Sequence, residues 1–404
     1  MIKKYLKKNY KLMFWLQAFL NFKVMNVVMT LFYLHRGLTL AEIFYLAIAW
    51  AVVGLLFEVP SSYLADRWGR KKTMILGVAL ACFQWIIMLF AADFLWFIVA
   101  AGLLSLSFAC FTGTDEALLY DTNKELGNEG NSLEKLGKYY SGQRIFKIFM
   151  PVIGALVAKD LLEWQFDILI ALEFVASVAS LIFAFRLVEP NHHVDVEKME
   201  AGVMKDAVKL IRSDWQFMKA ILSKTLIFIA SFIIWRFHQE FFVNIGISVL
   251  TLGIGWGIFH AVVFFLNQYV SSFLKNKSLA RRINLINAGF VAAAALLVLE
   301  LVFLRNGYVM LITFFVMDMF EVMRWPLYSE FYNKKCCAFN RATTLSLSNF
   351  IKSVFDIPLL FIGAWLISEN IEYPFVFSFA IGLFVIIFFR VRKVKQPCVK
   401  LEKV

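Results

Sequence analysis

Long apolar stretches follow one another along the whole chain. Apolar stretches of about 20 residues, the length that an α-helix needs to cross the hydrocarbon core of a membrane, occur twelve times. Their limits are 12–34, 40–65, 73–92, 94–120, 140–159, 164–187, 217–243, 250–274, 283–304, 307–332, 342–367 and 371–390. Because backbone groups in lipid need hydrogen-bond partners within their own segment, each stretch is predicted to be a helix. The expected fold class is an all-α integral membrane protein of twelve transmembrane helices.

One long polar segment, residues 188–216, interrupts this pattern and separates six spans from six. It predicts an N-terminal six-helix bundle (1–187), a cytoplasmic linker (188–216) and a C-terminal six-helix bundle (217–404). Two helical halves joined by a linker are typical of transporters in which one half rocks against the other around a central binding site.

Lysine and arginine predict the orientation. They concentrate at both ends of the chain, in the linker and in alternate loops, whereas the opposite loops carry only Arg36, Lys159 and Arg305. Cytoplasmic loops carry the excess of basic residues, so both termini are expected in the cytoplasm, with the chain in a bacterial inner (plasma) membrane. The stretch from Leu12 to Leu34 is longer than a signal-peptide core and lacks a cleavage site of small residues. It is therefore interpreted as the first span.

Composition supports a membrane protein and excludes other classes. Hydrophobic residues make up 61% of the chain and charged residues 17%, against about 25% charged in soluble domains. The net charge of +12 lies in short blocks between apolar stretches, which favours anionic lipid headgroups rather than nucleic acid as its partner. The five cysteines show no metal-ligand spacing, so we expect no metal site, no disulfide framework and no cofactor.

The loop after the second span carries a distinctive pattern of charges. It runs Ser62-Tyr63-Leu64-Ala65-Asp66-Arg67-Trp68-Gly69-Arg70-Lys71-Lys72. Asp66 follows a predicted helix, where a carboxylate can bond to Arg70 or to the N-terminus of another helix. Gly69 permits a tight turn that a bulkier residue would disfavour.

This loop resembles the signature of the major facilitator superfamily between helices two and three, G-x-L-A-D-R-x-G-R-K. Every fixed position matches except the first, where Ser62 replaces glycine. The resemblance implies the fold of that superfamily, a secondary transporter, and a gating motif formed by Asp66, Arg67, Gly69 and Arg70. It also implies an acidic partner for the second arginine at the cytoplasmic end of helix four, a position that Asp121 occupies.

A second pattern of the superfamily, G-x-x-x-G-P-x-x-G-G of many drug–proton antiporters, is nearly absent. Only Pro151 and Gly154 of the fifth span match it, which weakens the assignment as an antiporter. Other segments, from Glu58 to Ser61 and from Thr114 to Asp121, resemble a poorly characterised bacterial branch of the superfamily that is associated with efflux.

Ionisable residues inside the spans are the candidates for proton and substrate binding, because each costs about 2.5–3.5 kcal/mol to insert at mid-membrane. The candidates are Lys23, Glu58, Asp115, Arg236, Asp318, Glu321, Arg324, Lys352 and Asp356. In the superfamily, helices one, four, seven and ten line the cavity, so the resemblance implies that Lys23, Asp115, Arg236, Asp318, Glu321 and Arg324 face it.

Spacing offers a structural alternative for several candidates. Lys352 and Asp356 are four residues apart, and Glu321 and Arg324 are three apart, so each pair can neutralise itself on one helix face. Asp318 has no basic residue on its own helix face. A proton carrier must be ionised when it faces one side of the membrane and neutral when it faces the other. Loss of water favours the neutral carboxyl, and a nearby cation favours the ionised one. Asp318 is therefore the predicted proton carrier.

The expected function is secondary active transport of a small organic solute by alternating access, with proton-coupled efflux of a drug-like or amphiphilic compound as the first hypothesis. Lys23, Arg236 and Arg324 leave open an alternative, proton-coupled import of an organic anion or small nutrient. A second alternative is a sensor or scaffold that uses a transporter fold without transport. The expected partners are the solute and membrane lipids, with no nucleic acid, and the protein is expected to function as a monomer.

Overall fold

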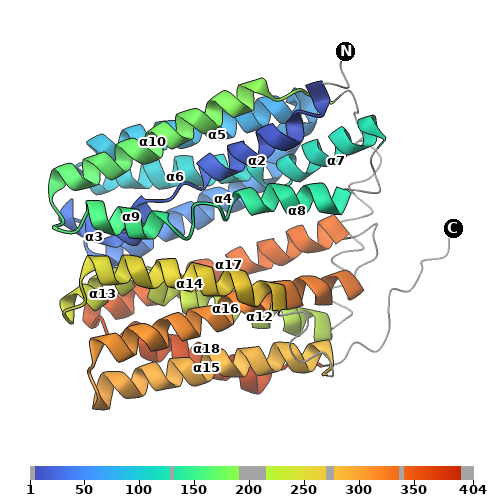
Figure 1. Ribbon diagram of the computed structural model, residues 1–404. Coiled ribbons are helices and arrows are strands. Elements are labelled where there is room, and N and C mark those ends of the chain that lie inside the picture. Colours follow the sequence, from blue (N-terminus) through green and yellow to red (C-terminus); the bar gives the residue numbers. More distant parts are fainter. Residues whose placement is uncertain (1–4, 128–131, 191–214, 270–276, 336–340, 393–404) are drawn as a thin grey trace. The chain divides into compact units, whose positions relative to one another are not determined.

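The computed structural model describes residues 5–127, 132–190, 215–269, 277–335 and 341–392, which form helices joined by short connections (Figure 1). The elements are α2 (Asn9–Leu20), η1 (Met25–Val27), α3 (Met29–His35), α4 (Leu40–Trp68), α5 (Arg70–Phe90), α6 (Phe94–Phe111), α7 (Thr114–Leu126), α8 (Ser132–Gly142), α9 (Met150–Val157), α10 (Glu163–Arg186), α12 (Trp215–Trp235), α13 (His238–Asn244), α14 (Val249–Tyr269), α15 (Leu279–Phe303), α16 (Gly307–Lys335), α17 (Arg341–Glu369) and α18 (Tyr373–Phe388). Most of the predicted linker lies outside the described residues.

The all-α fold is confirmed, and every predicted span coincides with helical structure. Within the described residues, eight helices are long and apolar enough to cross a membrane, or nine when the bent pair at the start of the chain counts as one span. Four predicted spans are interrupted helices, namely α2–η1–α3, α6–α7, α8–α9 and α12–α13. Continuous apolarity identified these spans, but it gave no sign of the interruptions.

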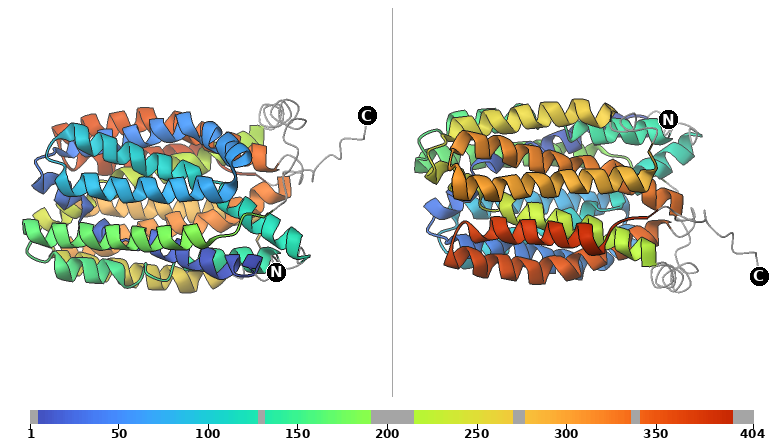
Figure 2. Two further views of the ribbon diagram at one scale, coloured as in Figure 1. Left: turned by 90° about the horizontal axis from the view of Figure 1, so that it is seen from above. Right: turned by 90° about the horizontal axis from the view of Figure 1, so that it is seen from below.

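Backbone proximity divides the chain into two compact units. Unit 1 comprises Met1–Val196 and Ser248–Ile258, and unit 2 comprises Glu197–Ile247 and Phe259–Val404, so the boundary passes through α14. In unit 1, α5 packs against α6 and α10, and α10 packs against α2 (Figure 1). In unit 2, α15 packs against α16 and α18, and α12 packs against α17 and α18 (Figure 2).

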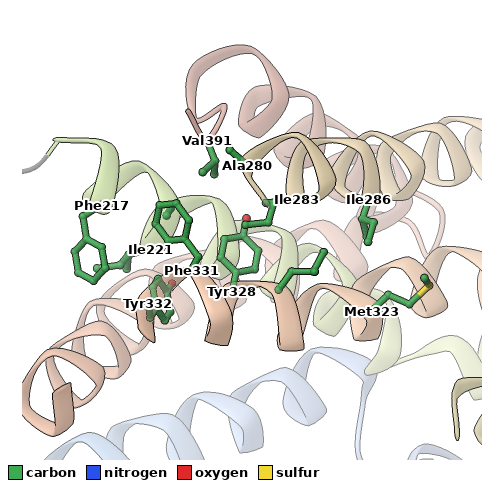
Figure 3. Packing of buried hydrophobic residues seen from close by; sticks show 12 residues of the cluster. Phe217, Ile221, Ala280, Ile283, Ile286, Met323, Tyr328, Phe331, Tyr332 and Val391 are labelled. Atoms are coloured by element: carbon green, nitrogen blue, oxygen red, sulfur yellow. The ribbon is translucent and has the colours of Figure 1, made fainter. Parts of the chain in front are cut away.

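The core of unit 2 is rich in aromatic residues (Figure 3). Phe217 of α12 and Tyr328, Phe331 and Tyr332 of α16 are all buried there. The Tyr328 hydroxyl donates to Ser223 Oγ of α12 over 2.8 Å and accepts from Asn287 Nδ2 of α15 over 3.2 Å. These polar contacts tie three helices together.

The first span of unit 1 is broken between α2 and η1, and farther along it bends by 56° where Asn9–Val27 meets Met29–His35. Glu173 of α10 lies at the break, where its Oε1 accepts the Met25 N–H over 3.2 Å. Gly154 of α9 packs against the same segment, since a Cβ atom at this position would lie 2.1 Å from the Val24 carbonyl oxygen. A glycine is therefore required for α9 to approach the broken helix this closely.

Candidate functional site

The charged loop after α4 forms a tight connection between two long helices. Gly69 has φ of +103°, a conformation that favours glycine, and it is the one residue between the end of α4 and the start of α5. The Arg70 guanidinium forms an ion pair with the buried Asp121 carboxylate of α7. Arg70 Nη1 also donates to the Ala117 carbonyl over 2.5 Å. The two contacts tie the start of α5 to α7.

Glu189, which follows α10, binds this loop, and sequence reasoning missed it. Its carboxylate accepts the Arg70 N–H over 2.9 Å and the Lys71 N–H over 2.7 Å. The first N–H groups of a helix need external acceptors, and Gly69 has no side chain to supply one. An acidic residue directly after the sixth span was the available signal, but the sequence does not show which helix it would reach.

Asp66 and Arg67, the other charged members of the motif, are exposed. Arg67 Nη1 donates to the Tyr63 hydroxyl over 3.4 Å. Asp66 has no hydrogen bond or ion pair to any residue whose side chain the structure describes.

Lys23 of unit 1 lies at the break of the first span and forms an ion pair with Glu173, with 3.4 Å between Lys23 Nζ and Glu173 Oε2. The Glu173 side chain is 1% exposed and that of Lys23 is 29% exposed. Lys23 Nζ also lies 5.4 Å from the centre of the Trp85 ring. The partner of Lys23 thus comes from another helix, 150 positions along the chain.

Asp115 lies in a chain of polar side chains that crosses unit 1. Its carboxylate accepts from the Tyr139 hydroxyl of α8, which in turn accepts from Gln17 Nε2 of α2. Gln17 Oε1 accepts from Asn21 Nδ2 over 2.9 Å at the end of α2. Glu58, by contrast, is half-buried in α4, and its backbone carbonyl accepts from the Ser61 hydroxyl over 3.0 Å.

Asp318 of α16 borders a cavity in unit 2. Ser231 Oγ of α12 donates to Asp318 Oδ1 over 2.6 Å. The cavity has a volume of about 220 Å³ and is lined by Phe228, Ser231, Phe232, Trp235, Asp318 and Glu321. It thus combines two carboxylates with a hydroxyl and three aromatic rings.

The other carboxylates near this cavity have basic partners on their own helices. Glu321 Oε1 accepts from Arg324 Nη2 over 2.9 Å and from Trp325 Nε1 over 3.0 Å. Lys352 and Asp356 form an ion pair on α17. Both pairs have the spacing that suggested self-neutralisation.

The three aromatic residues of the lining form a ladder on one face of α12. The Phe228 and Phe232 rings stack at 5.5 Å with 18° between their planes, and the Phe232 and Trp235 rings at 6.0 Å with 7° between planes. The Arg236 guanidinium lies 4.4 Å from the centre of the Phe232 ring. These three stacked rings therefore line one side of the cavity.

A family model for the major facilitator superfamily matches residues 14–356. The chain belongs to this superfamily. Membership assigns it to the transporters and not to the enzymes, as a multi-pass membrane protein. No curated protein matches the sequence at a significant level.

Solved structures of transporters share the fold of this superfamily member. A point mutant of the nucleoside transporter NupG matches with a TM-score of 0.76 at 13% identity, covering 95% of this chain and 98% of that one. A bacterial homologue of the human lysosomal transporter Spinster matches with 0.73 at 13% identity, covering 95% and 96%. A D-xylose–proton symporter matches with 0.73 at 11% identity, covering 96% of each chain. At these identities the likeness concerns the fold alone.

Within the residues that the structure describes, no three His, Cys, Asp or Glu side chains come together as possible metal ligands. The described cysteines, Cys82 and Cys110, are buried and free.

Proposed function

We propose that the chain is a proton-coupled secondary transporter that exports a small amphiphilic organic solute by alternating access. Two six-helix halves, residues 1–187 and 217–404, would move against each other around the site, joined by the linker. The observation that carries the proposal is the buried Asp318 carboxylate, hydrogen-bonded to a neutral hydroxyl beside a cavity. Ionisable residues within membrane spans commonly mark proton and substrate pathways.

Asp318 differs from the neighbouring carboxylates in its partners. Ser231 is its one hydrogen-bond partner among the described residues, whereas Glu321 and Asp356 each have an ion pair. The titratable and charged side chains on the surrounding elements include Glu321 and Arg324 on α16, Lys224 on α12, Arg236 and His238 at and after the end of α12, His260 on α14, Glu300 on α15, and Lys352 and Asp356 on α17. A carboxyl with a hydroxyl partner can exchange its proton without first breaking an ion pair.

The partners of the basic residues favour a neutral or cationic solute over an organic anion. The import hypothesis depended on Lys23, Arg236 and Arg324. Lys23 is paired with Glu173 and Arg324 with Glu321, so two of the three positive charges are already balanced. An anion would have to compete with a buried carboxylate at each of them.

The proposal also covers the setting of the transporter. We place it in a bacterial inner membrane, as a monomer with both termini in the cytoplasm, on the strength of the basic loops. Asp66, Arg67, Gly69, Arg70 and Asp121 would form the cytoplasmic gate. Cysteine labelling near Lys277 from the cytoplasmic side and near Asn306 from the opposite side would support this orientation, and the reverse pattern would contradict it.

Transport in proteoliposomes tests the proton-carrier role. A thermal-shift screen against metabolites and drugs identifies a solute, because a ligand stabilises the state that it binds. We expect Asp318→Asn to abolish accumulation driven by a pH gradient while solute exchange without a gradient persists. Asp318→Glu should retain some coupling.

Glu300→Gln is the matched control, because Glu300 is a buried carboxyl of unit 2 that bonds to Thr313 and not to the cavity lining. It should transport like the unaltered protein. An Asp318→Asn protein that still moves solute against its gradient would show that Asp318 is not the carrier. A protein with no flux for any solute that it binds would favour the sensor or scaffold alternative.

A further inference from the structure

We infer that the cavity beside Asp318 is a binding site for a small organic cation, made of one aromatic ring and a compact ammonium head. If the bound cation is also the transported solute, the inference rests on the proposed function. Binding of a cation in the cavity can be tested independently of transport. The inference follows from the charge of the lining, the aromatic ladder and the size of the cavity.

The charged groups in the lining are acidic. Asp318 and Glu321 contribute to it, and no basic side chain does so among the described residues. Arg324, which is 1% exposed, lies behind Glu321 and balances its charge. The charge of Asp318 has no such balance, since its hydrogen bond comes from the neutral Ser231 hydroxyl. An ionised Asp318 therefore leaves one negative charge facing the cavity, and a ligand cation would compensate it.

The aromatic rings around the cavity already hold cations on their faces. Lys352 Nζ lies 4.3 Å from the centre of the Phe228 ring, and the Arg236 guanidinium lies 4.4 Å from that of Phe232. Lys224 Nζ lies 4.4 Å from the centre of the Trp325 ring. A cation within about 6 Å of a ring centre is attracted by the negative face of the ring. A ligand between the ladder and Asp318 would gain both this attraction and an ion pair.

The basic side chains nearby work against a cation and have to be weighed. Lys352 is balanced by Asp356, and Lys224 and Arg236 lie outside the lining. Their charges act across the rings on which they sit, whereas a ligand in the cavity would touch Asp318 directly. Because Coulomb attraction falls with distance, the contact with Asp318 should dominate.

The volume of the cavity limits the size of the ligand. At about 220 Å³ it is smaller than the roughly 300–1,000 Å³ of pockets that take drug-sized ligands. A single ring with a small cationic head fits this space better than a drug of several rings. Since the cation and the proton would both bind the Asp318 carboxylate, each would weaken the binding of the other by the same factor.

Calorimetric titration of the purified protein in lipid nanodiscs tests the inference with three probes of similar shape. Phenyltrimethylammonium is a permanent cation, N,N-dimethylaniline is neutral at mildly alkaline pH, and benzenesulfonate is an anion. We expect the cation to bind at least about tenfold more tightly than the other two. Because protons compete for the Asp318 carboxylate, the affinity for the cation should fall as the pH is lowered. The probe itself does not titrate, so this change would come from the protein. Equal binding of all three probes, or tighter binding of benzenesulfonate, would overturn the inference.

Variants of the lining separate the ion pair from the ring contact. Asp318→Asn should weaken binding of the cation by roughly ten- to a hundredfold and remove most of its pH dependence. Asp318→Glu should restore much of both. Phe232→Leu, which keeps an apolar side chain without a ring, should weaken binding by about tenfold. Glu300→Gln should bind as the unaltered protein does, and circular dichroism and melting curves establish that each variant is folded.

Two results distinguish the inference from the proposed function. Cation binding that depends on Asp318, without transport driven by a pH gradient, would support the site and contradict proton coupling. Coupled transport of another solute, together with unchanged cation affinity in a folded Asp318→Asn protein, would contradict the site and leave the transporter proposal standing.

Discussion

The buried charges of unit 1 find their partners on other helices, whereas most of those near the cavity of unit 2 find them on the same helix. In unit 1, Lys23 pairs with Glu173 of α10, Arg70 with Asp121 of α7, and Asp115 bonds to Tyr139 of α8. In unit 2, Glu321 pairs with Arg324 within α16, and Lys352 with Asp356 within α17.

A pair that joins two helices sets their relative position, while a pair within one helix neutralises charge without restraining a neighbour. The charges of unit 1 therefore contribute chiefly to architecture. The ion pairs around the cavity of unit 2 balance charge within single helices, and the Asp318 carboxylate remains available for a ligand.

The two units also differ at their helix breaks. The break in the first span is stabilised from outside, because Glu173 of another helix accepts the Met25 N–H. The break between α12 and α13 is stabilised locally, with His238 Nδ1 2.8 Å from the Trp235 carbonyl oxygen. At the helix breaks, as among the buried charges, the partner in unit 1 comes from another helix and the partner in unit 2 lies close by in the sequence.

The largest effect should come from matched amide substitutions of one carboxylate in each unit. Glu173→Gln leaves Lys23 without its counter-charge, and we expect a loss of about 3 kcal/mol, the lower end for a broken buried ion pair because Lys23 is partly exposed. Asp318→Asn removes an unbalanced charge and keeps the Ser231 contact, so its stability should change by no more than about 1 kcal/mol. Thermal unfolding in nanodiscs measures both.

A double variant provides the control for this pair. Lys23→Met added to Glu173→Gln removes the unpaired cation, while the amide oxygen can still accept the Met25 N–H, and should recover much of the lost stability. Equal losses of stability in Glu173→Gln and Asp318→Asn would contradict the proposed difference between the two units.

A smaller effect is expected from a methyl group at the broken helix. In Gly154→Ala the new Cβ would lie 2.1 Å from the Val24 carbonyl oxygen, and the backbone can relieve this only by moving, at about 1–3 kcal/mol. Gly102→Ala on α6 is the control, because its Cβ would make an ordinary contact with Val53 at 3.8 Å. Melting temperatures measure the difference. If the two variants melt alike, the close approach of α9 to the break is not a constraint.

The smallest effect on stability should come from Asp66→Asn, because Asp66 is exposed; we expect a change within about 0.5 kcal/mol. Transport should nevertheless fall, with a shift in the distances between spin labels placed on the two halves, if Asp66 serves the gate. Glu189→Gln should instead cost about 0.3–1 kcal/mol, since it removes the anion that binds the N-terminus of α5. Label distances and transport identical to the unaltered protein in Asp66→Asn would exclude a gating role.

The sequence alone located the helical spans and their order, because the length of an apolar stretch directly reflects the thickness of the membrane. It also showed the same-helix pairs Glu321–Arg324 and Lys352–Asp356, since a spacing of three or four residues defines one helix face. The motif around Asp66 identified the superfamily through its resemblance.

Only the tertiary structure decided which charges meet across helices. Lys23 and Glu173 are 150 positions apart and Arg70 and Glu189 are 119 apart, and no periodicity relates them. The break in the first span was likewise hidden, because residues 21–24 lie inside the long, mostly apolar stretch 12–34. Hydropathy records how deeply a residue lies in the membrane, whereas contacts between helices depend on how each helix is rotated and shifted against its neighbours, which packing alone sets.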